Sequence, residues 1–214
     1  MSWISRNPVV VITRKMVIPN QEADISYPVV VGMANFIVQQ KINTQIVTLV
    51  NRVMAEQVDR LIQQGYKELH LSVSGFYELK TNERDVLSLT IGNYTFAYPA
   101  AHGLTMIRSL TFDTNTGKSY LLSEQFKQGS DYIKVLSDQI KEQIRERKIV
   151  LLNDLNGIEP EQDYYIADKC LVVYFQLYQL TAYVFGFPMF PISVYDIEDI
   201  IREDSPLGRM STND

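Results

Sequence analysis

Residues 35–65 have the sequence NFIVQQKINTQIVTLVNRVMAEQVDRLIQQG, and this stretch decides the fold. Its apolar side chains recur at spacings of three and four residues, with Gln, Asn, Thr, Arg and Asp between them. This period predicts an amphipathic helix from about 35 to 64, with Asn35 as its cap and Gly65 as its stop. About 28 residues give a helix roughly 42 Å long, so a sheet must cover its apolar face. That face comprises Ile42, Ile46, Leu49, Val50, Val53, Val58, Leu61 and Ile62.

Segments typical of strands lie on both sides of this helix. They are rich in Val, Ile, Leu and Tyr, and several alternate apolar with polar residues. Pro28 places the second segment near a sheet edge, and Gly75 predicts a bulge in the third. Strands in runs, rather than one strand after each helix, favour an antiparallel sheet. The expected strands are 8–18, 25–31, 68–80, 86–96 and 104–112.

The second half of the chain predicts a smaller set of elements. Ser130 and Asp131 open a second amphipathic helix that continues to residue 148. After it we expect two β-rich stretches and a short helix, at 164–178, 183–194 and 195–201. The whole pattern predicts an α+β fold, with antiparallel sheets packed on one long N-terminal helix and on the second amphipathic helix.

Charge and composition exclude several classes of function. The chain has 214 residues, a net charge of -5 and 46% apolar residues, which is ordinary for a folded globular protein. Its acidic balance, with no basic stripe to offset it, argues against nucleic acid as a partner. No apolar stretch is long enough to span a membrane and no signal peptide is recognisable, so we expect no membrane insertion and a cytoplasmic location. The composition leaves the oligomeric state open.

Reactive side chains are few. The single cysteine, Cys170, cannot form an internal disulfide or a cysteine-based zinc site. The two histidines, His70 and His102, are far apart in the sequence, and no His-x-x-x-His is present. Dinucleotide-binding, phosphate-loop, hydrolase-elbow and metalloprotease motifs are also absent from the sequence. We therefore expect no metal, no cofactor and no catalytic residue.

Four local strings carry a family resemblance. They are Tyr98–Gly103 (YPAAHG), Leu110–Lys118 (LTFDTNTGK), Leu122–Tyr132 (LSEQF followed by GSDY) and Tyr174–Gly186 (YFQLYQLTAYVFG). From Gly92 onward the chain resembles the DUF3298 domain, and the stretch before it resembles the DUF4163, or PdaC-type, domain. This pair is found in the extracytoplasmic region of RsiV-type lysozyme-sensing anti-sigma factors. It is also found as an accessory segment ahead of the catalytic domain of some peptidoglycan deacetylases.

The resemblance implies a non-catalytic ligand-binding or sensor module of the kind found in Firmicute surface proteins. It divides the chain into a DUF4163-like strand-helix-strand region over 1–91, a DUF3298-like α+β domain over 92–202 and a flexible tail over 203–214. The sequence departs from the family pattern where a Glu is replaced by Gln179. It departs again where Ala-Pro-Tyr becomes Thr181-Ala182-Tyr183. The metal-binding catalytic domain of the deacetylases has no counterpart in these 214 residues.

The ligand, a protein or a cell-wall-like glycan, is expected to bind in two neighbouring places. His102 lies in a loop of small residues between two strands, and Gly103 would let a ligand approach the backbone. Tyrosine offers an apolar plate and a hydroxyl group, which suits a glycan or a protein surface, and residues 178–190 are rich in aromatic side chains. The predicted ligand-binding residues are Tyr98, His102, Gly103, Tyr178, Tyr183, Phe185 and Phe187.

Three alternatives stay open at this point. His102 could be a structural histidine that bonds a neighbouring carbonyl group. A hydrolase acting on a glycan would instead pair His102 with a carboxylate that folding brings within about 3.2 Å. A structural oligomer subunit would expose a large apolar patch. Among the carboxylates, Asp163 and Asp168 flank residues 164–167, and nothing near them in the sequence indicates a raised pKa.

Overall fold

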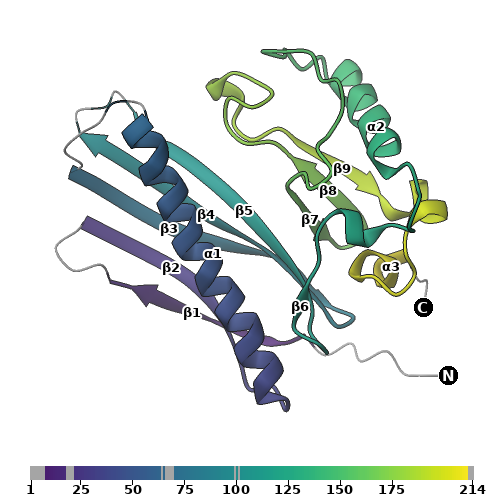
Figure 1. Cartoon of the computed structure of the whole chain (residues 1–214), viewed down its shortest axis with the longest axis horizontal. Helices are drawn as coiled ribbons and strands as arrows, with labels where there is room; N and C mark the ends of the chain where they lie inside the picture. Colours follow the sequence, from purple (N-terminus) through teal and green to yellow (C-terminus); the bar gives the residue numbers. More distant parts are fainter. Residues whose placement is uncertain are drawn as a thin grey trace.

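The computed structural model describes residues 8–17, 22–63, 65, 70–98, 100 and 102–211 (Figure 1). Within this part of the chain, a long helix lies along a six-stranded sheet, and a smaller group of strands and helices packs beside one edge of that sheet. The expected α+β class is confirmed. The expected strand ends at residue 18 and at residues 68–69 lie outside the described residues, as do residues 212–214 of the expected tail.

The large sheet has its strands in chain order. They are β1 (Val10–Met16), β2 (Glu22–Val31), β3 (His70–Glu83), β4 (Val86–Tyr98), β5 (Leu104–Asp113) and β6 (Lys118–Ser119). All neighbours are antiparallel except β2 and β3, which are parallel because a helix makes the crossover between them. Only residues 22–25 of β2 pair with β3, so Pro28 lies in the half of β2 that pairs with β1 alone.

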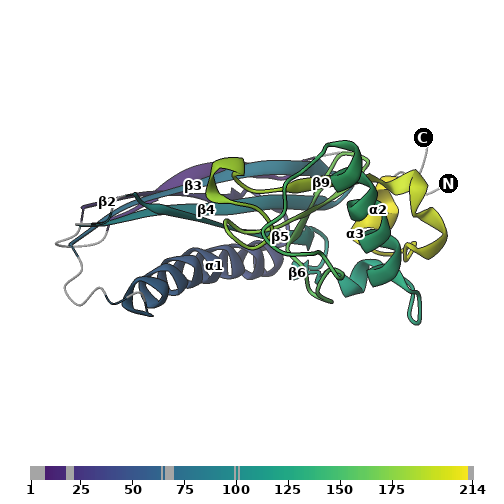
Figure 2. The ribbon, with the colours of Figure 1, turned by 90° about the horizontal axis from the view of Figure 1, so that it is seen from above.

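The crossover helix α1 (Phe36–Gln63) covers one face of the large sheet (Figure 2). Asn35 caps it as predicted, because its side-chain oxygen accepts hydrogen bonds from the backbone N–H groups of Ile37 and Val38. Gly65, with φ of +94°, ends it. No helix in the described residues has the length and hydropathy that crossing a membrane requires. The core beneath α1 includes Ile25, Val30, Ile42, Ile46, Val50, Val53, Leu87, Leu89, Met106 and Phe112.

Gly75 marks the parallel pairing rather than a bulge, so the sequence-based expectation is wrong. Gly75 lies opposite Ile25, where the short parallel ladder between β2 and β3 ends. A Cβ atom at Gly75 would lie 2.6 Å from Cγ2 of Ile25, so only glycine allows this approach. The irregularity in β3 instead falls between Leu79 and Thr81, near the hairpin that leads into β4.

The smaller part of the molecule combines a three-stranded antiparallel sheet with short helices. The sheet contains β7 (Tyr164–Ala167), β8 (Cys170–Tyr174) and β9 (Met189–Ser193). The helices are α2 (Tyr132–Glu146), α3 (Pro206–Ser211) and the 3₁₀ turns η1 (Ser123–Gln125), η2 (Tyr183–Phe185), η3 (Val194–Asp196) and η4 (Glu198–Ile200). The expected helix over 195–201 is thus two 3₁₀ turns, and Asp131 makes no side-chain cap on α2.

Strand β7 joins the two parts because it packs against β3, β4 and β5. Two buried hydroxyl groups fix its position. Thr81 Oγ1 donates to the carbonyl oxygen of Ile166 at 3.0 Å, and Ser88 Oγ accepts from the backbone N–H of the same residue at 3.0 Å. Because unpaired polar groups are costly in a core, these bonds fix where the small sheet meets the large one.

The C-terminal residues are packed where a flexible tail was expected. Helix α3 occupies much of the expected tail, and its Leu207 and Met210 are buried. Arg209 forms an ion pair with Asp113, and its Nη1 donates to the carbonyl oxygen of Asp85. The expected boundary between residues 91 and 92 falls inside β4, so the large sheet continues across it.

Candidate functional site

The structure brings the His102 loop against the segment that carries Tyr178 and Tyr183. The centroids of the His102 and Tyr183 rings are 4.9 Å apart, and those of Tyr178 and Tyr183 are 5.6 Å apart. Tyr183 Oη also donates a long hydrogen bond, of 3.5 Å, to the carbonyl oxygen of Gly103. Phe185 lies on the same 3₁₀ turn as Tyr183 and is 54% exposed. We call His102, Tyr178, Tyr183 and Phe185 the aromatic surface.

The other three predicted site residues have different surroundings. Tyr98 is exposed at the end of β4. Gly103 is buried, and a Cβ atom there would lie 2.4 Å from the ring of Tyr94, so its lack of a side chain makes room for that ring. Phe187 is half-buried and packs against a core cluster that includes Ile107. The structure therefore gives Gly103 and Phe187 packing roles beneath the surface.

Two tight turns between β8 and β9 position Tyr178, Tyr183 and Phe185 of the aromatic surface. In the first, the backbone N–H of Gln179 donates to the carbonyl oxygen of Gln176, and Tyr178 has a φ of +66°. A positive φ is uncommon for a residue with a side chain and persists only where the surroundings enforce it. In the second, η2 ends at Gly186, which also has a φ of +66°. Contacts with neighbouring segments must therefore stabilise the first turn.

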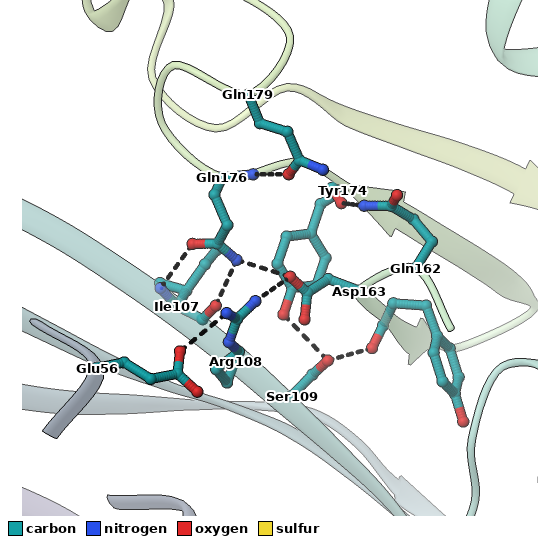
Figure 3. Close-up of polar contacts among 10 residues, drawn as sticks. Glu56, Ile107, Arg108, Ser109, Gln162, Asp163, Tyr174, Gln176 and Gln179 are labelled. Carbon is teal, nitrogen blue, oxygen red and sulfur yellow. Dashed lines mark hydrogen bonds and ion pairs between the residues drawn. The ribbon is translucent and has the colours of Figure 1, made fainter. Parts of the chain in front are cut away.

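The side chain of Gln176 makes these stabilising contacts (Figure 3). Its side-chain oxygen accepts from the backbone N–H of Ile107 at 3.3 Å, and its Nε2 donates to the carbonyl oxygen of Ile107 at 2.6 Å. The same Nε2 lies 2.8 Å from Oδ2 of Asp163. Gln179, which stands where the family pattern has Glu, accepts from the backbone N–H of Gln176 at 2.9 Å. The amide group of Gln176 thus connects the loop to β5, whereas that of Gln179 bonds within the loop.

Arg108 lies at the centre of the polar contacts below this loop (Figure 3). Its Nη1 is 2.6 Å from Oδ2 of Asp163, and its Nη2 is 2.9 Å from Oε2 of Glu56. Next to it on β5, Ser109 Oγ donates to the carbonyl oxygen of Tyr164 and accepts from Tyr174 Oη at 3.1 Å. One stretch of β5 therefore links α1, the small sheet and the loop between β8 and β9, which we call the aromatic loop.

Burial raises the pKa of Asp163 above its ordinary value, because the carboxylate loses water on folding. The positive charge of Arg108 and the hydrogen bonds from Gln176 and Arg108 act in the opposite direction, but they do not outweigh burial. Nearby Glu56 adds a smaller raising effect. The sequence contained no indication of a raised pKa at Asp163, and the structure corrects this. Burial lowers the pKa of Arg108, but its two carboxylate partners outweigh burial and raise this pKa, so the guanidinium group stays charged.

Two open cavities flank Arg108. One, of about 570 Å³, lies between α1, β5 and the η1 region, and the other, of about 420 Å³, lies toward the turn that carries Tyr178. Arg108, Glu161, Gln162 and Asp163 line both. Both volumes fall in the range of small-molecule sites.

His102 itself bonds to its own neighbour, because its Nδ1 lies 3.0 Å from the carbonyl oxygen of Gly103. Among the described residues, no carboxylate makes a hydrogen bond or ion pair with His102. The same residues contain no group of three or more His, Cys, Asp or Glu side chains arranged to hold a metal ion. Burial raises the pKa of the Cys170 thiol, which disfavours the reactive thiolate.

Sequence reasoning missed the contacts around Arg108. Glu56, Arg108, Asp163 and Gln176 lie on four separate segments of the chain, and no local spacing relates them. One signal was present, since Arg108 interrupts an otherwise apolar and hydroxyl-bearing strand. A charge at such a position requires a partner.

Comparisons with known proteins support the family resemblance. Residues 124–195 match the family model described as "Protein of unknown function (DUF3298)". The chain is also 28% identical over 190 residues to the anti-sigma-V factor RsiV of Bacillus subtilis (strain 168). That alignment covers 83% of this chain and 65% of the relative, so this chain spans about two thirds of the relative's length.

Solved structures share the fold across the chain. A DUF3298 family member from Bacteroides fragilis superposes with a TM-score of 0.73 at 12% identity, covering 98% of this chain and 100% of that one. A DUF3298 family protein from Pseudomonas aeruginosa gives a TM-score of 0.70 at 10% identity, covering 98% and 99%. At these identities the likeness concerns the fold alone. The chain thus carries a DUF3298 match over residues 124–195, within a fold that it shares with solved DUF3298 proteins.

Proposed function

We propose that this chain is a non-catalytic binding or sensor module that holds a protein ligand on the aromatic surface. The observation that carries the proposal is the row of ring contacts from His102 through Tyr183 to Tyr178, with Phe185 exposed beside it. Aromatic side chains are enriched in protein interfaces, where they supply contact area at a low entropic cost. Val184 in the same turn is 83% exposed, and an aliphatic side chain at this position suits a protein surface better than a sugar.

The comparisons are consistent with this proposal. The relative in Bacillus subtilis is an anti-sigma factor, a name that points to a role in binding a protein. Because this chain spans 65% of that protein, we propose that it corresponds to a ligand-sensing part of such a factor. The DUF4163-like character of residues 1–91, an origin among Firmicute surface proteins and a cytoplasmic location remain predictions.

A cell-wall-like glycan is the other ligand class for the aromatic surface. A hydrolase acting on such a glycan would require a carboxylate within reach of His102. Within the described residues, His102 instead bonds the carbonyl oxygen of Gly103, so the hydrolase alternative gains no support from the geometry. Ring contacts and exposed aromatic side chains support binding instead.

The test is a binding titration with two probes, hen lysozyme and a purified muropeptide mixture, followed by calorimetry. The double variant Tyr183→Ala/Phe185→Ala removes two rings of the aromatic surface. We expect the wild-type chain to bind lysozyme, and the double variant to bind at least about tenfold more weakly, since truncating an anchor residue costs about 2 kcal/mol or more.

Phe36→Ala is the matched control, because Phe36 is 64% exposed at the start of α1, away from the aromatic surface. We expect it to bind like the wild type. Binding of muropeptides in place of lysozyme, with the same loss in the double variant, would assign the surface to a glycan. Equal binding by the wild type and the double variant, or no binding of either probe, would contradict the proposal.

A further inference from the structure

The two cavities beside Arg108 form one groove along α1. They share Arg108, Glu161, Gln162 and Asp163 as lining residues, so they meet at that point. We call the joined space the Arg108 groove. Its volume is large enough for a ligand of several rings. At one end it is lined by Tyr120 and at the other by Tyr178, which also belongs to the aromatic surface.

One face of α1 forms a wall of this groove. Apart from the buried Leu49, its lining residues are spaced three or four positions apart, so they project from the same side of the helix. They carry amide, hydroxyl and charged groups, in contrast to the apolar face that covers the sheet. These wall residues are Gln45, Thr48, Arg52, Glu56 and Arg60.

Charge in the groove is close to balanced. Arg108 forms ion pairs with both Glu56 and Asp163, so these three groups together carry one net negative charge. The remaining charges are Arg52 and Arg60 on the helix, opposed by carboxylates on the loop that precedes β7. These carboxylates are Glu159 and Glu161. An anion would meet those carboxylates and a cation would meet the arginines, so the field favours neither strongly.

The lining suits a neutral ligand with many hydroxyl groups. Thr48, Ser119 and Gln179 offer donors and acceptors on exposed or half-buried side chains. Arginine and glutamate side chains add donors and acceptors to the same walls. Tyr178, which is 49% exposed, provides an apolar plate at one end. Convergent polar groups next to an aromatic plate are the recognition chemistry of sugar rings.

We propose that the Arg108 groove binds a neutral oligosaccharide, at a site separate from the protein-binding aromatic surface. The two sites touch at Tyr178, so a chain lying in the groove would reach the edge of the aromatic surface. This proposal does not rest on the protein-binding proposal, because none of the helix residues that line the groove belongs to the aromatic surface.

The test uses a panel of neutral tetrasaccharides, namely chitotetraose, cellotetraose and maltotetraose, with calorimetry and ligand-observed NMR. Thr48→Arg places a bulky side chain on the groove wall. Thr44→Arg is the matched control, because Thr44 is an exposed threonine of the same helix that does not line the groove. We expect at least one tetrasaccharide to bind the wild type. Thr48→Arg should weaken that binding about tenfold or more, and Thr44→Arg should change it less than about twofold.

Additional variants and probes distinguish binding in the groove from binding on the aromatic surface and from binding of a charged ligand. Tyr183→Ala should retain tetrasaccharide binding, and Thr48→Arg should leave lysozyme binding unchanged. Inorganic phosphate and spermidine serve as the charged probes, and neither should compete with the bound sugar. The proposal is overturned if no tetrasaccharide binds at about 5 mM. It is also overturned if the two arginine variants bind alike, if Tyr183→Ala abolishes sugar binding, or if a charged probe displaces the sugar.

Discussion

Nη1 of Arg108 lies 2.6 Å from Oδ2 of Asp163, and this ion pair joins the large sheet to the small one. Arg108 belongs to β5, whereas Asp163 comes directly before β7. The second contact of the guanidinium group, with Glu56, adds α1 to the same junction. The side chains of Arg108 and Asp163 are 27% and 19% exposed, so water screens the pair less than it screens a surface pair.

A double-mutant cycle will measure this coupling. Arg108→Ala leaves two carboxylates without their cation, and Asp163→Ala removes one carboxylate from Arg108. Because the pair is partly buried, we expect a coupling free energy of about 1–3 kcal/mol from urea unfolding of the two single variants and the double variant.

Lys15 and Asp24 provide the comparison for that cycle. They form an ion pair at 2.8 Å between β1 and β2, but their side chains are 66% and 69% exposed. Exposed pairs contribute less than about 1 kcal/mol. An Arg108–Asp163 coupling no larger than that of Lys15–Asp24 would show that this ion pair does not stabilise the junction between the two sheets.

The raised pKa of Asp163 predicts an unusual pH dependence of stability. Because the folded state raises this pKa, it holds the proton of Asp163 more tightly than the unfolded state does. The contribution of the carboxyl group is then fully present below its unfolded pKa, and is lost as the pH rises through the folded value. Lowering the pH from about 7 to about 4 should therefore increase the free energy of unfolding of the wild type relative to that of Asp163→Asn.

Urea unfolding of both proteins across this pH range provides the measurement. The other carboxyl groups are common to both proteins, so their contributions largely cancel in the difference. A shift in favour of Asp163→Asn at low pH would show that Arg108 lowers the pKa more than burial raises it.

Local patterns in the sequence predicted the elements but not the crossing between β2 and β3. The period of α1, the cap at Asn35 and the stop at Gly65 all follow from nearby residues, and the structure confirms them. The parallel pairing of Ile25 with Gly75 depends on where α1 returns the chain, which no local pattern encodes. The same limit explains α3, because Arg209 contacts Asp85 and Asp113, which are distant in the sequence.

The candidate site also contains some residues that the sequence predicted and others that only the structure revealed. Aromatic density marked Tyr178, Tyr183 and Phe185 in the sequence, and the structure places them beside His102. The alternation of exposed and buried positions was not evident in a segment made of turns, so Phe187 was grouped with them although it packs inward. The groups that hold this segment come from other elements and become visible only after folding.

Gln176 should control the order of the aromatic loop. Gln176→Ala removes its bonds to both backbone groups of Ile107 and to Asp163, and leaves buried polar groups without partners. We expect a loss of about 2 kcal/mol of stability and faster hydrogen exchange over residues 176–187. Gln179→Ala, which removes a single bond from an exposed side chain, is the milder comparison. Unchanged hydrogen exchange in Gln176→Ala would show that the two turns are ordered without the side chain of Gln176.

Gly103 should be needed for its lack of a side chain. A Cβ atom in Gly103→Ala would meet the Tyr94 ring at 2.4 Å, and the ring would have to move. We expect a cost of about 1–3 kcal/mol in thermal or urea unfolding, as for other overpacked sites. The pair Gly103→Ala/Tyr94→Ala should cost less than the two single variants added together, since the second change removes the obstacle. If the free-energy changes of the two single variants add up to that of the double variant, the destabilisation by Gly103→Ala comes from the backbone of Gly103 instead of from contact with Tyr94.

Thr181 offers a stability gain in the loop that carries the aromatic surface. It is 1% exposed, and its hydroxyl oxygen has no hydrogen-bond partner among the described residues. Valine has nearly the same shape without the hydroxyl group, so Thr181→Val should remove the desolvation cost and stabilise the fold by about 1 kcal/mol. Thr181→Ser keeps the hydroxyl group but loses a buried methyl group, so it should destabilise. If urea unfolding shows that Thr181→Val is the less stable variant, the hydroxyl group must be satisfied in solution, and its burial would then help to fix the loop.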